Sequence, residues 1–109
     1  MSENIEDLTV RYEEEGVVVI DELDKRILSK GAWATVIFLF REWDRKTGDY
    51  KPGRKATIRR YRKVSGQFRQ QSKFNISSAN QGMAVAAILQ EWFKGDGGTG
   101  GEETEGEGD

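Results

Sequence analysis

The sequence predicts an α+β fold in which a four-stranded antiparallel sheet is followed by one C-terminal helix. Three observations predict this fold. Four runs of strand-forming residues follow one another between residues 17 and 76, separated by short polar turns. Ser65-Gly66 joins the last two runs as a two-residue hairpin connection. After residue 76 the apolar spacing changes to that of a helix, which we expect to run to about Lys94.

The first predicted strand covers residues 17–28 and begins with four β-branched residues. A Lys30-Gly31 turn separates it from the second strand, residues 33–44. This second strand is apolar on both faces, because Ile37 and Leu39 alternate with Val36, Phe38 and other apolar side chains. We therefore expect a central strand that the helix covers on one side and a second subunit or a ligand covers on the other.

The third and fourth predicted strands, residues 54–64 and 67–76, form a hairpin with a basic side chain at every second position. A loop at residues 45–49 and a Pro52-Gly53 turn precede it. Its cations are Arg54, Lys55, Arg59, Arg60, Arg62, Lys63, Arg69 and Lys73. No acidic residue lies between Tyr50 and Glu91, so these like charges repel one another across the hairpin. A polyphosphate backbone would neutralise them, and the pattern therefore predicts binding to nucleic acid.

Aromatic residues lie among these charges, and they indicate which kind of nucleic acid is bound. They are Trp43, Tyr50, Tyr61, Phe68 and Phe74. Unpaired bases stack on such rings, so the predicted ligand is a single strand rather than a duplex. Trp43, Tyr50 and Tyr61 are expected at the surface, and Phe74 in the core. We expect these cations and rings to share the concave side of one folded pair of subunits.

The predicted helix has two apolar stripes. Ser77 or Ser78 is expected to cap its first turn. The stripe that we expect on the sheet comprises Gly82, Val85, Ile88, Leu89 and Trp92. A helix this apolar is expected to pack against a copy of itself as well, which predicts a homodimer. The predicted dimer interface comprises Met83, Ala86, Ala87, Gln90 and Phe93.

The charge is divided along the chain although the net charge is only −2. Residues 1–24 carry nine acids and one base, residues 25–94 sixteen bases and four acids, and residues 95–109 six acids and no base. We expect an acidic flexible leader at 1–15, a single-stranded nucleic-acid-binding domain at 16–94 and a disordered acidic Gly-rich tail at 95–109. The tail has three open interpretations: a solubilising segment, a mimic of nucleic acid that folds over the basic face, or a binding segment for a protein partner.

The composition argues against several functional classes. The chain has neither cysteine nor histidine, so thiolate chemistry and the usual general base are absent. Glu42, Asp44 and Asp49 are interpreted as charges that pair with nearby Arg or Lys rather than as a Mg²⁺ cluster. We therefore expect no enzyme activity, no catalytic residues, no metal and no cofactor. With no apolar run long enough for a membrane span, we expect a cytoplasmic protein associated with the nucleoid.

Two motifs around the central loop resemble a known family. They are Phe-Leu-Phe-Arg-Glu-Trp at residues 38–43, followed by Gly48-Asp49-Tyr50, and Lys-Pro-Gly-Arg-Lys at residues 51–55. These motifs resemble the transcriptional coactivator positive cofactor four family, and the Lys-Pro-Gly-Arg-Lys match is the specific part. The basic hairpin is longer than in that family, and the leader is acidic where eukaryotic members carry a Ser/Lys-rich one.

The resemblance implies a Whirly-like fold, with four antiparallel strands in a strongly curved sheet and one helix. It also implies a homodimer built through the helices and binding of single-stranded or unwound DNA with little sequence preference. By position, the implied DNA contacts are Arg41, Trp43, Lys51, Arg54 and Lys55. Charge and stacking add Arg59, Arg60, Tyr61, Arg62, Lys63, Arg69 and Lys73. Two other functions stay open: an RNA-binding protein or chaperone, and a transcription regulator that docks on other proteins.

Overall fold

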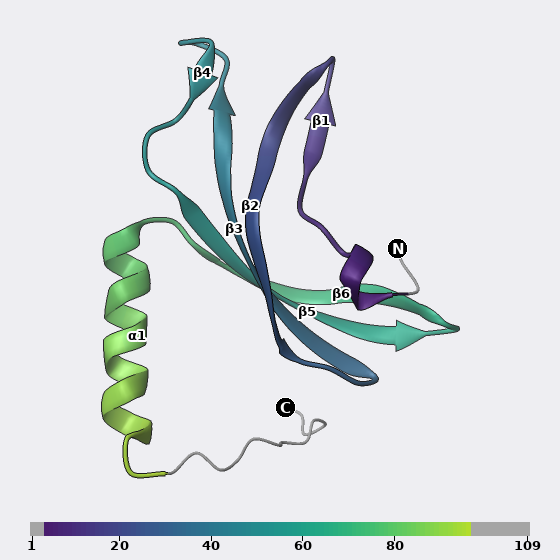
Figure 1. Cartoon of the computed structure of the whole chain (residues 1–109), viewed down its shortest axis with the longest axis vertical. Coiled ribbons are helices and arrows are strands. Elements are labelled where there is room, and N and C mark those ends of the chain that lie inside the picture. Colours follow the sequence, from purple (N-terminus) through teal and green to yellow (C-terminus); the bar gives the residue numbers. More distant parts are fainter. Residues whose placement is uncertain (1–3, 97–109) are drawn as a thin grey trace.

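A computed structural model describes residues 4–96, which form one curled antiparallel sheet followed by a single helix (Figure 1). The sheet has six strands in the order β1-β2-β3-β5-β6, and β4 pairs only with the end of β3. The elements are a 3-10 turn η1 (Ile5–Asp7), β1 (Tyr12–Glu14), β2 (Val17–Ser29), β3 (Trp33–Asp44), β4 (Asp49–Tyr50), β5 (Lys55–Val64), β6 (Gln67–Ile76) and α1 (Ala79–Phe93). None of the helices in this part of the chain is long and apolar enough to cross a membrane.

The predicted α+β class, with an antiparallel sheet and a C-terminal helix, is confirmed, but the predicted number of four strands is wrong. The four expected strands are β2, β3, β5 and β6. Two short strands join them. β1 lies in a run of glutamates and pairs with the start of β2 across a turn at Glu15 and Gly16, both with positive φ. The chain tolerates charges there because β1 is an edge strand, and its side chains are exposed.

β3 is the central strand, as expected, and it divides the sheet into two faces. Its side chains alternate between fully buried and half-buried from Trp33 to Phe40. We call the side of Ala34, Val36, Phe38 and Phe40 the covered face. The side of Thr35, Ile37, Leu39, Arg41 and Trp43 is the open face. The main core lies on the covered face, where Tyr61 of β5 and Phe68 of β6 join the even-numbered residues of β3.

The N-terminal segment, residues 4–11, covers this core, and we call it the arm. Ile5, Leu8 and Val10 are buried in the same cluster as the β3 side chains. Lys25 Nζ donates hydrogen bonds to the carbonyl oxygens of Ile5, Glu6 and Leu8, at 2.9, 2.7 and 2.7 Å. One lysine therefore satisfies three backbone acceptors that lie outside any ladder. Residues 4–11, which were expected to belong to a flexible leader, thus pack as part of the folded unit.

The helix begins where the sequence predicts, but it does not lie on the sheet. Ser78 is the N-cap, and its Oγ accepts a hydrogen bond from the Gln81 amide at 3.1 Å. No helix residue is buried, and Leu89 and Trp92 are 44% and 69% exposed, so the predicted packing of this stripe on the sheet is wrong. The reason is local: only two residues join α1 to β6, an edge strand, so the helix extends away from the sheet (Figure 1).

Candidate nucleic-acid interface

The cations of the hairpin lie on both faces of the sheet. In the pairing of β5 with β3, Arg59 is opposite Val36 on the covered face, and Arg60 is opposite Thr35 on the open face. Alternation along β5 and the pairing of β5 with β6 assign the rest, and the register shift beside Arg60 and Tyr61 puts Arg69 and Lys73 on opposite faces although both lie in β6. Lys55, Arg59, Lys63 and Lys73 belong to the covered face, and Arg60, Arg62 and Arg69 to the open face. The expectation that all these cations share one side is therefore wrong.

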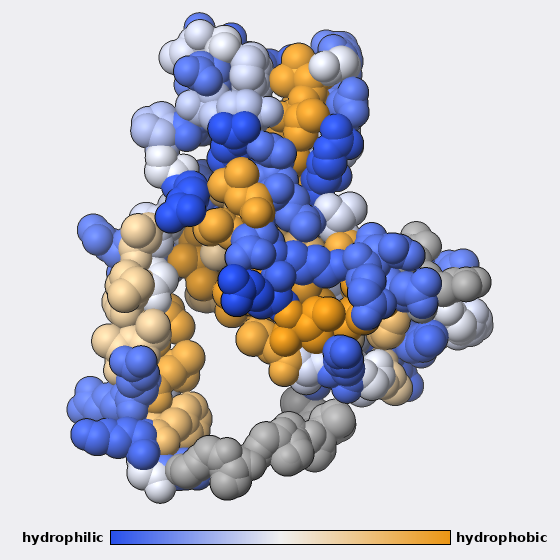
Figure 2. All heavy atoms as spheres, viewed as in Figure 1, coloured by the Kyte–Doolittle hydropathy of each residue, from blue (hydrophilic) through white to orange (hydrophobic). Residues whose placement is uncertain are grey.

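Like charges lie directly opposite each other at two points of the hairpin. Arg59 pairs with Lys73 on the covered face, and Arg62 pairs with Arg69 on the open face. Residues directly opposite in an antiparallel pair have Cβ atoms about 5 Å apart, so like charges there destabilise the fold. Figure 2 shows hydrophilic side chains over this part of the molecule.

Four exposed cations on strands β5 and β6 are not neutralised within the part of the chain that the structure describes. Arg62, Lys63, Arg69 and Lys73 are exposed and form no ion pair with a carboxylate of residues 4–96. Lys63 lies with its Nζ 5.3 Å from the centroid of the Phe68 ring. These side chains can therefore bind an external anion without first breaking an ion pair with a carboxylate of residues 4–96.

A group of two rings and one cation, which includes the predicted contact residues Arg41 and Trp43, lies at the end of β3. The rings of Trp43 and Tyr50 meet edge to face with centroids 5.0 Å apart. The Arg41 guanidinium lies 3.7 Å from the Tyr50 centroid, and its Nε donates to Asp21 at 2.7 Å. The Tyr50 hydroxyl donates to the Val18 carbonyl at 3.0 Å, which fixes the ring. All three side chains are half-buried, so part of each surface remains accessible.

The Lys-Pro-Gly-Arg-Lys segment lies beside this group, and its lysines share one carboxylate. Glu42 Oε1 accepts a hydrogen bond from Lys55 Nζ at 2.8 Å and lies 3.7 Å from Lys51 Nζ. Arg54 is exposed in the turn before β5. Within residues 4–96, no group of three or more Asp, Glu, His or Cys side chains is arranged to hold a metal ion. The pairing of Glu42 agrees with its interpretation as a partner of lysines.

Two aromatic residues do not lie where the sequence placed them. Tyr61, expected to stack on bases, is only 3% exposed in the core of the covered face, and burial raises the pKa of its phenol. It lies opposite Ala34, whose small side chain leaves room for the ring. Its assignment as a stacking surface is therefore wrong. Phe74, expected in the core, is 51% exposed, because it lies on the open face of an edge strand.

Sequence reasoning missed a second group of rings and cations, at the start of β3. The Trp33 ring centroid lies 4.7 Å from the guanidinium carbon of Arg60 and 5.4 Å from that of Arg62. Trp33 and Trp43 are both odd-numbered residues of β3, so the alternation of side chains predicts that both lie on the open face. Its proximity to the arginines depends on the register between β3 and β5, and the sequence does not reveal this register.

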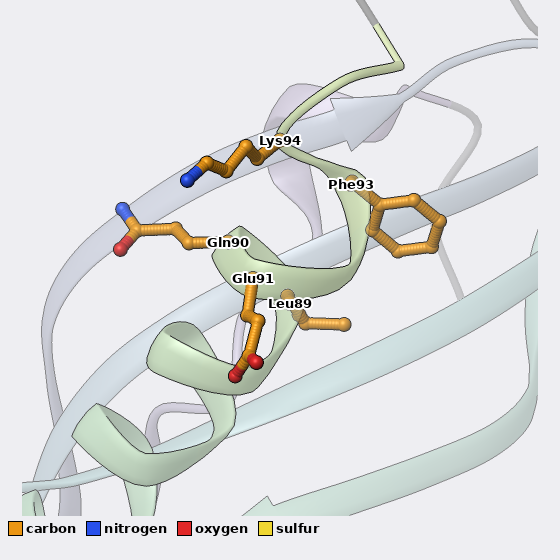
Figure 3. Close-up of a pocket in the computed structure, with 5 residues that line it drawn as sticks. All are labelled: Leu89, Gln90, Glu91, Phe93 and Lys94. Atoms are coloured by element: carbon orange, nitrogen blue, oxygen red, sulfur yellow. The ribbon is translucent and has the colours of Figure 1, made fainter.

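The predicted dimer residues, Met83, Ala86, Ala87, Gln90 and Phe93, are all exposed, and their spacing places them along one side of the helix. Figure 3 shows Leu89 and Phe93 pointing to one side and Gln90 and Lys94 to the other. The large exposed apolar side chains Ile88, Leu89, Trp92 and Phe93 follow the helical spacing of one stripe with half-buried Val85. Phe93 of the predicted interface belongs to this stripe, and Gln90 does not.

The acidic tail lies almost wholly outside the described residues, which end at Asp96, so its three interpretations stay predictions. Comparisons with models of protein families, with curated proteins and with solved structures found no match, so the family resemblance also stays a prediction.

Proposed function

We propose that this chain is a non-enzymatic protein that binds single-stranded DNA with little sequence preference and acts as a homodimer. The observation that carries the proposal is the opposition of like charges on the hairpin, Arg59 with Lys73 and Arg62 with Arg69. These pairs cost stability in the free protein, and phosphates lying between them would remove that cost. Because β6 is an edge strand, a bound strand that follows this edge can reach cations of both faces.

The rings favour a single strand over a duplex as the ligand. Trp43 and Tyr50 lie beside Arg41, and Trp33 lies beside Arg60 and Arg62. A base must leave its duplex stack before it can stack on a ring, and each such contact contributes about 1–3 kcal/mol. Stacking does not distinguish one base strongly from another, which supports binding with little sequence preference.

The helix supports assembly of two copies. An isolated α1 would expose the apolar stripe of Ile88, Leu89, Trp92 and Phe93 to water. Contiguous apolar surface of this kind on a helix marks an interaction site. A second copy brings an identical stripe, so the two helices cover each other by a symmetric interface.

The first test measures fluorescence anisotropy of labelled oligo-dT and of a matching duplex at several salt concentrations. We expect the single strand to bind more tightly than the duplex. With four unneutralised cations in contact with phosphates, the slope of log K against log salt should be about −3 or steeper. Equal affinity for the two ligands, or no dependence on salt, would contradict the proposal. Competition with an RNA oligomer separates DNA binding from RNA binding, because only RNA offers a 2′-hydroxyl.

A charge reversal tests the hairpin itself. Arg69→Glu replaces a repulsive pair with Arg62 by an attractive one, so we expect the free energy of unfolding to rise by about 0.5 kcal/mol. The same change should lower the affinity for oligo-dT and reduce the salt slope by at least about 0.7 for the lost phosphate contact. Urea denaturation and anisotropy measure the two effects.

Lys46→Glu is the matched control for this reversal. Lys46 is an exposed lysine in the turn between β3 and β4, outside the predicted interface, and its reversal changes the net charge by the same amount. We expect it to leave affinity nearly unchanged. An equal loss of affinity in both variants would mean that net charge, rather than the hairpin, governs binding.

A further inference from the structure

Three side chains form a row across three neighbouring strands of the open face. Trp33 of β3 is opposite Arg62 of β5, and Arg62 is opposite Arg69 of β6. The Lys63 amide donates to the Ala32 carbonyl at 2.7 Å, so pairing between β3 and β5 continues past Trp33 and fixes this register. Neighbouring strands lie about 4.8 Å apart, so the row is roughly 10 Å long and ends at the edge of the sheet. Figure 1 shows β3, β5 and β6 side by side.

The chemistry changes along this row from cationic to aromatic. Arg69 and Arg62 are exposed and form no ion pair with a carboxylate of residues 4–96. At the other end, the guanidiniums of Arg60 and Arg62 lie within 5.4 Å of the centroid of the half-buried Trp33 ring. Planar guanidinium groups and aromatic rings are both surfaces on which unpaired bases stack. A nucleotide combines an anionic phosphate with a planar base, and the row offers a partner to each.

We infer that Trp33, Arg62 and Arg69 form a nucleotide-binding subsite, in which the arginines bind phosphate and the Trp33 ring with the flanking Arg60 stacks on a base. The inference rests on the proposed function and extends it to a residue that neither the charge pattern nor the family motifs select. At about 3.4 Å per stacked nucleotide, the row accommodates about three nucleotides. The Trp43–Tyr50 group lies at the opposite end of β3, ten residues away, so it is a separate contact.

The direct test uses the fluorescence of Trp33. Because the chain has three tryptophans, Trp43→Phe and Trp92→Phe together leave Trp33 as the sole source of tryptophan emission. Titration with oligo-dT should lower this emission, and the loss should saturate at the same oligonucleotide concentration as the anisotropy. Binding detected by anisotropy with unchanged emission would overturn the inference.

A pair of substitutions separates stacking from packing. Trp33→Phe keeps an aromatic ring, whereas Trp33→Leu keeps apolar bulk without one. We expect Trp33→Leu to weaken binding of oligo-dT about fivefold or more, and Trp33→Phe to stay within about twofold of the wild type. Equal affinities of the two variants would mean that Trp33 only packs in the sheet. Thermal melts of both variants identify any loss that comes from unfolding.

Arg62 provides the second pair of variants. Arg62→Lys keeps the charge but loses the planar guanidinium, whereas Arg62→Gln loses both. Loss of affinity in the order wild type, Lys variant, Gln variant supports phosphate binding by the guanidinium, whose paired hydrogen bonds a lysine cannot reproduce, and an unchanged affinity in the Gln variant overturns it. The failures are distinguishable. A wild-type protein that binds no oligonucleotide overturns the proposed function. Normal binding without a change in Trp33 fluorescence overturns only the subsite.

Discussion

Arg59 and Arg60 are neighbours in the sequence, yet they lie on opposite faces of the sheet. Arg59 donates through its guanidinium to Gln70 Oε1 at 3.0 Å, and Arg60 lies over Trp33. The alternation of side chains in a strand causes this separation. A dense run of basic residues in a β-hairpin therefore produces two cationic surfaces that meet at the strand edge. The sequence revealed the density of charge, but one surface was expected where two are present.

Tyr61 gives a prediction about alkaline pH. Burial raises the pKa of its phenol above the ordinary value of 10.0, so the folded state favours the neutral form. Its contribution to stability is complete below about pH 10 and is lost as the pH rises from 10 through the folded-state pKa. We expect the free energy of unfolding, measured by urea denaturation, to fall above about pH 10. Tyr61→Phe should make this fall less steep.

Tyr12→Phe is the control for this titration, because Tyr12 is 54% exposed. Its substitution should leave the dependence of unfolding on alkaline pH unchanged. If both variants change the slope equally, the burial of Tyr61 is not its cause.

At the scale of elements, the arm supplies a test of whether the N-terminal segment belongs to the folded unit. Leu8 is buried among the core side chains of the covered face. Leu8→Ala should lower the free energy of unfolding by about 2–5 kcal/mol, because it removes apolar contacts and leaves a cavity. Asp7→Ala, a change at an exposed neighbour, should stay within about 0.5 kcal/mol of the wild type. Similar values for the two variants would mean that the arm does not stabilise the sheet.

The regular elements were largely predictable, because each has its own local signal. The predicted strand at 17–28 is observed at Val17–Ser29, and the strands at 33–44 and 67–76 have the predicted bounds. Four irregularities in the strand pairing had no such signal. The register shifts once between β1 and β2, beside Tyr12 and Glu13, and twice between β2 and β3, at residues 22–24 and 27–29. It shifts once more between β5 and β6, beside Arg60 and Tyr61. A bulge is a property of a strand pair, so one strand read alone does not reveal it.

At the scale of the whole molecule, no other element among residues 4–96 covers the helix, and this leads to a prediction about the oligomeric state. We expect light scattering coupled to gel filtration to give twice the mass of the chain. Leu89→Glu places a charge within the stripe of Ile88, Leu89, Trp92 and Phe93, so it should yield monomers. Gln90→Glu adds the same charge on the other side of the helix and should leave the dimer intact (Figure 3). A dimer broken only by Gln90→Glu would instead support the interface predicted from the sequence.

The candidate site was predictable in its chemistry and only partly in its members. Consecutive basic residues without an intervening acid identified the hairpin as the cationic surface, and the motif around residues 38–55 identified Arg41 and Trp43, which lie together with Tyr50. Tyr61 was included wrongly and Trp33 was omitted. Both errors have one cause: whether a ring on a strand is buried or exposed depends on what packs over that face, and the sequence alone does not show this.

By itself, the sequence determined the fold class, the order of the main elements and the segregation of positive charge, because periodicity, turn residues and charge are local properties of the chain. Only the tertiary structure decided which face the arm covers, which cations lie opposite one another and that the helix does not lie on the sheet. These outcomes depend on strand register and on contacts between residues far apart in the sequence, where the packing of the whole chain outweighs local preference.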